Sequence, residues 1–399
     1  MSNDTRPEIR FPGFTEDWEE RKLIDLVVRL NKSTNSSRLP KVEFEDIVAG
    51  EGRLNKDVSQ KFDNRKGIEF LPNDILYGKL RPYLKNWLKA TFTGVAIGDF
   101  WVFRAKKSDS DFIYSLIQAD RYQKAANDTS GTKMPRSDWK KVSDTVFYIP
   151  NDLKEQQKIG IFFKKLDDTI ALHQRKLDLL KETKKGFLQK MFPENGAKVP
   201  EIRFPGFTED WEERKLGELG KTQSGIGFPD AEQGGSEGTP FFKVSDMNNI
   251  GNEYEMRNAN HYVSNEQIER KKWKPIKDVP AIIFAKVGAA IMLNRKRLVT
   301  SPFLIDNNTM AYLFNNTWDI YFGKILFETI NLPRYSQVGA LPYYNSSDIE
   351  NISVKVPVKD EQQKIGTFFK QLDDTIALHQ RKLDLLKETK KSFLQKMFV

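Results

Sequence analysis

Two loops in the first half of the sequence collect the residue types that bind nucleic acid. One loop is Gly78–Lys85 (GKLRPYLK), which places three cations and a tyrosine around a turn. The other is Thr129–Ser137 (TSGTKMPRS), which is basic, rich in hydroxyl groups and prone to turn. Lys and Arg side chains can bond to guanine edges or to phosphates, and hydroxyl and backbone N–H groups bind phosphates. The candidate nucleic-acid contacts are therefore Lys79, Arg81, Tyr83, Lys85, Thr132, Lys133, Arg136 and Ser137.

The second half has a less basic set of the same kind. Its candidates come from a turn and a later loop, and they are Lys286, Asn294, Arg295, Lys296, Arg297, Ser336, Gln337, Tyr343, Tyr344 and Asn345. The alternative is that all these loops are solvated and bind nothing, and the zero net charge of residues 217–360 strengthens that alternative for this half. The overall charge of +9 is weak evidence for DNA binding, because residues 155–192 and 361–399 carry +7 of it.

These loops lie inside a repeated frame. Pro7–Leu23 recurs unchanged at Pro200–Leu216, and Glu155–Pro193 recurs at Glu361–Val399 with 4 of 39 positions altered. The two inserts, residues 24–154 and 217–360, differ almost everywhere. A repeated frame that holds two unlike inserts suggests one scaffold built to bind two different targets.

The longer repeat predicts a helix over 155–192, with Asp152 as N-cap and Pro193 after its end. At about 1.5 Å per residue, this helix is a rod of about 57 Å. Apolar residues at steps of four and three predict a coiled-coil seam, and the polar seam residues His173 and Lys184 are interpreted as setting its register. The seam is Ile159, Phe163, Leu166, Ile170, His173, Leu177 and Leu180, with copies Ile365, Phe369, Leu372, Ile376, His379, Leu383 and Leu386.

Two identical seams in one chain most simply pack on each other as an antiparallel pair with an internal two-fold axis. Pairing with helices of another subunit is the alternative. The inserts alternate short apolar runs with turns and a few helical stretches, which is typical of mixed α/β domains. The runs include Asp74–Tyr77, Phe100–Phe103, Val146–Ile149, Ala281–Phe284, Met310–Phe314 and Ile352–Val356, with helical stretches Asp111–Ala126 and Asp319–Ile330. The predicted class is α+β, with domains 1–154 and 200–360, helices 155–192 and 361–399, and a linker 193–199.

Composition excludes several kinds of site. The chain has no cysteine and three histidines, so a thiolate or histidine-rich metal centre is excluded. No apolar run is long enough to cross a membrane and no secretory signal opens the chain, so we expect a cytoplasmic protein. Gly220-Lys221-Thr222 lacks the first glycine of a phosphate loop, since position 215 is Lys215. Asp230 and Glu269 with Lys271 only loosely match a nuclease carboxylate–lysine set.

The whole pattern resembles the DNA-specificity subunit of type I restriction–modification enzymes. The resemblance covers essentially the whole chain. It rests on Arg10–Phe14 (RFPGF) with Trp18-Glu19, on the two loops of the first insert, and on the two helices that begin Glu-Gln-Gln-Lys-Ile. The second insert departs from the pattern, with Ala285–Gly288 (AKVG) in place of Gly-Lys-Leu-Arg.

The resemblance implies a non-catalytic subunit in which each insert reads one half of a bipartite, asymmetric target in double-stranded DNA. It also implies that the helices set the gap between the halves and dock two modification (methyltransferase) subunits, which restriction subunits join. S-adenosylmethionine, ATP and Mg²⁺ are then expected in the partner subunits and no cofactor in this chain. The alternative functions are a stand-alone nuclease or methyltransferase with its own recognition domains, and a coiled-coil adaptor that binds proteins.

Overall fold

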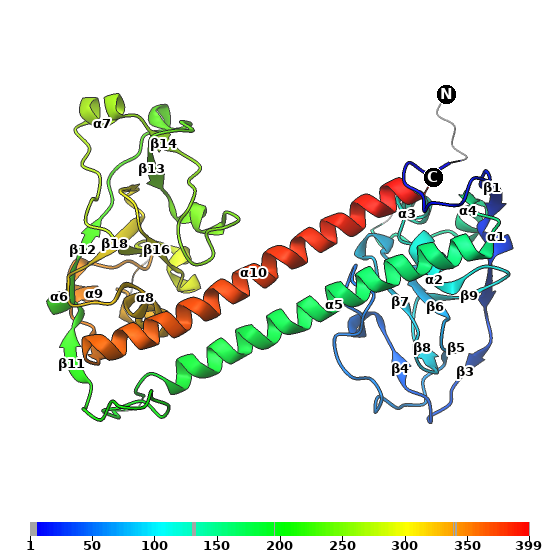
Figure 1. The fold of residues 1–399 in the computed structure, drawn as a ribbon, viewed down its shortest axis with the longest axis horizontal. Coiled ribbons are helices and arrows are strands. Elements are labelled where there is room, and N and C mark those ends of the chain that lie inside the picture. The colour runs from blue at the N-terminus through cyan, green and yellow to red at the C-terminus, as the bar shows by residue number, and fades with distance from the viewer. Residues whose placement is uncertain (1–5, 130–132, 195, 338, 340, 399) are drawn as a thin grey trace. The chain divides into compact units, whose positions relative to one another are not determined.

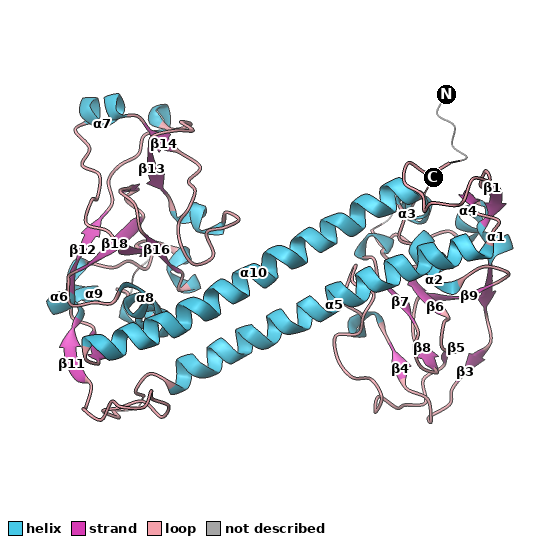
Figure 2. Cartoon of the chain, viewed as in Figure 1, coloured by secondary structure: helices cyan, strands magenta, loops and turns pink. Residues whose placement is uncertain are grey.

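The computed structural model describes residues 6–129, 133–194, 196–337, 339 and 341–398 (Figure 1). They form two compact units, each a mixture of strands, short helices and parts of two long helices (Figure 2). The first unit comprises residues 1–175 and 380–399, and the second comprises residues 176–379. The expected α+β class is confirmed.

The first unit is built from small sheets. β1 (Glu19–Lys22) pairs with β10 (Val146–Ile149). A four-stranded antiparallel sheet has the order β2 (Val27–Leu30), β9 (Phe100–Ala105), β6 (Ile75–Gly78) and β7 (Trp87–Lys89). A second sheet has the order β3 (Ser33–Thr34), β5 (Gly67–Phe70), β8 (Gly94–Ala96) and β4 (Lys41–Val42), and β4 runs parallel to β8. The short helices are α1 (Leu23–Leu26), α2 (Ser110–Leu116), α3 (Asp120–Asn127) and α4 (Trp139–Asp144).

The second unit repeats much of this plan. β11 (Glu212–Lys215) pairs with β19 (Ser353–Val356). The four-stranded antiparallel sheet has the order β12 (Gly220–Ser224), β18 (Thr309–Phe314), β15 (Ala281–Ala285) and β16 (Lys296–Val299). A smaller sheet has the order β14 (Tyr262–Val263), β13 (Thr239–Phe242) and β17 (Leu304–Ile305), with β13 and β17 parallel. The short helices are α6 (Leu216–Leu219), α7 (Asn265–Lys271), α8 (Ile320–Thr329) and α9 (Ser346–Glu350).

The long helices are α5 (Leu153–Lys190) and α10 (Lys359–Met397), and they pack against each other in antiparallel fashion. In the first unit the beginning of α5 lies beside the end of α10 (Figure 1), with the rings of Phe162 and Phe393 5.0 Å apart. Further along α5, Asp167 bonds to Lys390, which lies nearer the start of α10. The second unit repeats both contacts with the roles of the helices exchanged, through Phe187–Phe368 at 5.0 Å and Lys184–Asp373 at 2.8 Å.

The short repeat and the long repeat fold against each other within each unit. In the first unit, Arg10 donates two hydrogen bonds, 2.6 and 2.8 Å long, to the carboxylate of Glu155, which is 1% exposed. In the second unit, Arg203 makes the same pair of bonds to Glu361 at 2.7 and 2.8 Å. A bidentate guanidinium–carboxylate pair fixes orientation as well as distance. The two repeats of the sequence are therefore one structural element, present once in each unit.

Each insert packs a helix N-terminus onto this repeated element. Gln156 accepts a hydrogen bond from the backbone N–H of Asp109, the N-cap of α2, at 3.0 Å. Gln362 does the same for Asp319, the N-cap of α8, at 2.9 Å. A Cβ at Gly160 would come within 2.6 Å of the Asp109 carboxylate, so glycine is needed for this close approach. Inserts of unlike sequence thus attach to the frame in the same way.

Among the described residues, no helix combines the length and apolar composition that a membrane span requires.

Candidate nucleic-acid interface

The structure brings the two basic loops of the first insert together. Past the end of β6, Arg81 N–H donates to the carbonyl of Pro135 at 2.7 Å, and Ser137 N–H donates to the carbonyl of Lys79 at 2.8 Å. Leu80 and Arg136 face each other across this short antiparallel bridge. We call Lys79–Arg81 with Pro135–Ser137 the first clasp. The clasp joins residues that are far apart in sequence into one surface.

The side chains of the first clasp surround one carboxylate that the sequence did not single out. Asp99 lies just before β9 and pairs with Arg136 at 2.8 Å and with Lys79 at 3.6 Å. Lys79 also donates its backbone N–H to the carbonyl of Asp99 at 2.9 Å. The only sequence signal for Asp99 is its place in a Gly-Asp pair before an apolar run, which is also a common turn signal.

Most other candidates of the first insert are exposed next to the clasp. Arg81 is exposed, with a left-handed backbone at φ +49°. Tyr83 is 56% exposed, and Lys85 and Lys133 are exposed. Ser137 instead points inward and its hydroxyl donates to the carbonyl of Ala126 at 2.8 Å. Thr132 lies outside the described residues.

The second insert forms the same clasp from different residues. Gly288 N–H donates to the carbonyl of Pro342 at 2.8 Å, and Tyr344 N–H donates to the carbonyl of Lys286 at 3.0 Å. Val287 and Tyr343 face each other across the bridge. We call Lys286–Gly288 with Pro342–Tyr344 the second clasp. Its Gly288 occupies the position of Arg81 and shares the positive φ, here +86°.

Several candidates of the second insert use their donors inside the protein. Lys296 donates from Nζ to the carbonyl of Ile330 at 2.6 Å, and burial lowers its pKa to about 8. Arg297 donates to the carbonyl of Asn252 at 2.5 Å, and burial lowers the pKa of its guanidinium. Tyr344 is 1% exposed in the core, where burial raises the pKa of its hydroxyl.

The remaining candidates of this insert are bonded to nearby groups. The side chain of Asn294 accepts from Leu332 N–H at 3.1 Å. Arg295 donates to Asn248, Ser336 donates to the carbonyl of Pro333, and Gln337 donates to Asp348. Asn345 forms the capping box of α9. Tyr343, at 40% exposed, presents its ring at the surface of the second clasp.

The seam positions of α5 and α10 are buried or half-buried. Ile159, Phe163, Ile170 and Leu177 are at most 9% exposed, as are their copies Ile365, Phe369, Ile376 and Leu383. Leu166, Leu180, Leu372, Leu386, His173 and His379 are half-buried. The apolar spacing in the sequence therefore marked buried faces of the two helices, and at Ile159, Phe163, Ile365 and Phe369 these faces lie in the cores of the two units.

A group of buried charges surrounds the seam lysine of the second unit. The ammonium of Lys184 lies 2.6 Å from Glu328 and 2.8 Å from Asp373. Lys324 also pairs with both carboxylates. Burial lowers the pKa of Lys184, but the two carboxylates outweigh it and the pKa is raised. In the first unit, the equivalent Lys390 lies 2.6 Å from Asp167 and 2.6 Å from the amide oxygen of Gln118.

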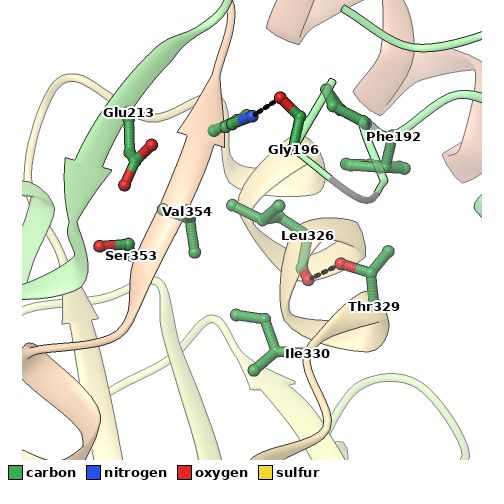
Figure 3. A pocket seen from close by; sticks show the side chains of 10 residues that line it. Phe192, Gly196, Glu213, Leu326, Thr329, Ile330, Ser353 and Val354 are labelled. Atoms are coloured by element: carbon green, nitrogen blue, oxygen red, sulfur yellow. Dashed lines mark hydrogen bonds between the residues drawn. The ribbon is translucent and has the colours of Figure 1, made fainter. Parts of the chain in front are cut away.

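The second unit also has a cleft of about 340 Å³ (Figure 3). Apolar side chains line it, including Phe192, Leu326 and Val354. The ammonium of Lys355 donates to the carbonyl of Gly196 at 3.1 Å, and Thr329 donates to the carbonyl of Leu326 at 2.7 Å. The Lys355 ammonium thus holds the chain segment after α5, and the Thr329 hydroxyl bonds within α8. Within the described residues, no group of three or more His, Cys, Asp or Glu side chains is placed to hold a metal ion.

Comparison with known proteins gives the family. Residues 15–182 and 208–388 both match the type I restriction modification DNA specificity domain. The type I restriction enzyme MjaVIII specificity subunit of Methanocaldococcus jannaschii is 24% identical over 314 residues, which cover 72% of this chain and 68% of that protein. The MjaIX specificity subunit of the same organism is 22% identical over 312 residues, with the same coverage.

Solved structures have the same fold. A type I restriction-modification system S subunit from M. genitalium superposes with a TM-score of 0.67 at 15% identity, over 99% of both chains. A chain from a study of complex assembly and conformational transition in the type I R-M system has a TM-score of 0.53 at 17% identity, over 94% of this chain and 96% of that one.

Proposed function

The chain belongs to the type I restriction modification DNA specificity family, and on that premise we propose that its two inserts read the two halves of a bipartite, asymmetric sequence in double-stranded DNA. Both halves of the chain are specificity domains, and a specificity subunit is the non-catalytic component of its system. The alternative of a stand-alone nuclease or methyltransferase has no support from the family.

The observation that carries this proposal is the pair of clasps. In the first insert, the chain directly after the buried strand β6 forms a bridge with the loop that precedes α4. In the second insert, the chain directly after the buried strand β15 forms the same bridge with the loop that precedes α9. Around the first clasp the exposed side chains include Arg81, Tyr83, Lys85, Lys133 and Arg136, which match the chemistry of phosphates and base edges, together with the apolar Met134 and Leu84. Around the second clasp they are mainly apolar or neutral, such as Met292, Leu341 and Tyr343. Two similar frameworks with unlike surfaces suit two unlike half-sites.

We propose recognition domains 1–154 and 200–360, joined through the helices 155–192 and 361–399 and the linker 193–199. The helices set the unspecified gap between the half-sites and dock two modification subunits, which restriction subunits join. S-adenosylmethionine, ATP and Mg²⁺ act in those partner subunits. The exposed leucines Leu172, Leu179, Leu378 and Leu385, between 57% and 67% exposed, are apolar residues that such a partner would cover. The assembly works in the cytoplasm.

Single-molecule sequencing of DNA methylation tests the proposal. Cells that express the chain with its modification subunits should show one bipartite methylated motif, and cells without the chain should lose it. Replacing residues 24–154 by the insert of another specificity subunit should change one half of the motif and leave the other half unchanged. Methylation that persists without the chain, or a swap that changes both halves, would show that the inserts do not read separate half-sites.

A further inference from the structure

The two clasps share a geometry that their sequences do not share. Besides the two bonds across each bridge, Lys79 donates to the carbonyl of Asp99 at 2.9 Å, and Lys286 donates to the carbonyl of Asn308 at 2.7 Å. All three backbone hydrogen bonds of the first clasp therefore have a counterpart in the second, and each bond differs by at most 0.2 Å between the two clasps. Equivalent side chains differ at Arg81 and Gly288, and the other segment has Arg136-Ser137 where the second clasp has Tyr343-Tyr344, while both clasps keep a proline before these residues.

A lysine is the one charged side chain at equivalent positions of both clasps, Lys79 in the first and Lys286 in the second. On the other side of the bridge, Arg136 faces Leu80 in the first clasp and Tyr343 faces Val287 in the second. The backbone N–H of this lysine bonds to the carbonyl of Asp99 in the first clasp and to the carbonyl of Asn308 in the second. The Asp99 carboxylate also pairs with Lys79 at 3.6 Å, whereas the side-chain amide of Asn308 donates to Asp306. The common chemistry is thus one ammonium group on a fixed backbone.

Two half-sites of different sequence have only their sugar–phosphate backbone in common. A geometry and a charge that are kept in both inserts therefore fit the part of the DNA that is the same in both half-sites. A lysine ammonium is a compact point charge on a flexible stem, which suits a phosphate better than the directed pattern of a base edge. Arg136 pairs with Asp99 at 2.8 Å through one terminal nitrogen, and the second clasp has Tyr343 in its place, so Arg136 is not part of the chemistry that the two clasps share.

We propose that the clasps bind DNA phosphates, through Lys79 in the first domain and Lys286 in the second, and that the bases are read by other parts of each insert. This inference rests on the proposed DNA-binding function. Asp99 is a positioning residue: it holds Lys79 and Arg136 at the surface of the first clasp and makes no contact with a base.

The experiment measures both affinity and sequence preference in the assembly of the full chain with its modification subunits. The variants are Lys79→Ala and Lys286→Ala, which leave the backbone bonds of the clasps in place. Lys22→Ala and Lys215→Ala are matched controls, since each removes one positive charge at equivalent frame positions on β1 and β11. The DNA is a duplex with the methylated motif found for the wild type, and the dissociation constant is measured from about 50 to about 200 mM salt.

Each clasp variant should weaken binding and reduce the slope of log K against log salt by about 1, because one phosphate contact is lost. Over that fourfold salt range the variant should lose about fourfold less affinity than the wild type. The controls should keep the wild-type slope, and every variant should keep both methylated half-sites. An unchanged slope in Lys79→Ala and Lys286→Ala, or an equal loss of slope in the controls, overturns the inference.

Asp99→Asn removes the negative charge and leaves the backbone carbonyl of the clasp in place. If Asp99 only positions cations, Asp99→Asn leaves the half-site unchanged. A carboxylate that read cytosine or adenine would instead change the preferred base when it is replaced, and that result overturns the inference. Failure of the proposed function looks different, since the wild-type chain would then direct no sequence-dependent methylation.

Discussion

The buried lysines at equivalent seam positions should differ in their effect on stability. Replacing Lys184 by Met removes the ammonium that lies 2.6 Å from Glu328 and 2.8 Å from Asp373 and leaves two carboxylates with Lys324 alone. The side chains of Lys184, Asp373 and Lys324 are all less than 10% exposed and that of Glu328 is 23% exposed, so water can replace the lost partner at Glu328 but not at Asp373. Breaking a buried ion pair by removing one partner costs about 3–5 kcal/mol, and we expect Lys184→Met to fall in that range.

Lys390→Met is the matched control, because Lys390 is the copy of Lys184. It pairs with Asp167, whose side chain is 25% exposed, and with the neutral amide of Gln118. Burial already raises the pKa of Asp167, so this carboxyl can take up a proton once the lysine is gone. We expect a cost of about 1–3 kcal/mol, which is that of an unsatisfied buried hydrogen-bonding group.

Hydrogen exchange measured by mass spectrometry can locate each loss. Lys184→Met should lower the protection of α8 and leave that of α2 and α3 unchanged, and Lys390→Met should do the reverse with a smaller amplitude. A double variant, Lys184→Met with Glu328→Gln, removes one stranded carboxylate and should recover part of the stability. Equal losses from the two lysine variants, or a double variant less stable than Lys184→Met alone, would refute the reasoning.

Three further predictions follow from the same contacts. Lys324 and Lys184 outweigh burial and hold the pKa of Glu328 below its ordinary value of 4.5, so its stabilising contribution is present above that pH and is lost as the pH falls through the folded-state pKa. Burial raises the pKa of Asp167, so protonation of this carboxyl as the pH falls favours the folded first unit instead of destabilising it. Acid should therefore lower the exchange protection of α8 before that of α2. Arg10→Gln and Arg203→Gln should each destabilise their own unit by about 3 kcal/mol in urea titrations, because each removes the guanidinium that pairs with a buried carboxylate, and an effect of only one of them would contradict the equivalence of the two copies. Inserting one heptad in both α5 and α10 should lengthen the unspecified gap in the methylated motif, and any change in the half-sites themselves would count against the helices as a spacer.

The sequence predicted the long helices and the longer apolar strands because each has a local signal, whereas it did not single out short strands such as β3 and β4. The expected helical stretch Asp111–Ala126 is two helices, α2 and α3. The six apolar runs expected as strands correspond to β6, β9, β10, β15, β18 and β19. The long helices lie two residues earlier than expected at both ends, since α5 begins at Leu153, directly after the Asp152 cap, and ends at Lys190. Met191 and Phe192 leave the helix and enter the core of the second unit, which apolar periodicity alone cannot distinguish from one more helical turn.

The candidate site was predicted less completely because its geometry depends on long-range pairing. Nothing local to Arg81 indicates that its N–H bonds to Pro135, so the clasps and the role of Asp99 could not be foreseen. Residue type also misled at Lys296 and Arg297, which were grouped with surface cations by composition. Both are half-buried because carbonyls of distant segments, those of Ile330 and Asn252, accept their hydrogen bonds.

The arrangement of charges explains why two nearly identical helices are sufficient to build two units with unlike inserts. Each helix carries an aspartate and, seventeen positions later, a lysine: Asp167 and Lys184 on α5, and their copies on α10. In each unit the aspartate comes from one helix and the lysine from the other. A substitution at either position of one helix alone therefore strands a partner in one unit, whereas the same substitution pattern in both copies keeps every pair matched. The self-complementary pairing of an antiparallel repeat thus favours identical copies, and the inserts are free to differ because their frame contacts run through a few residues such as Gln156 and Gly160 and their counterparts.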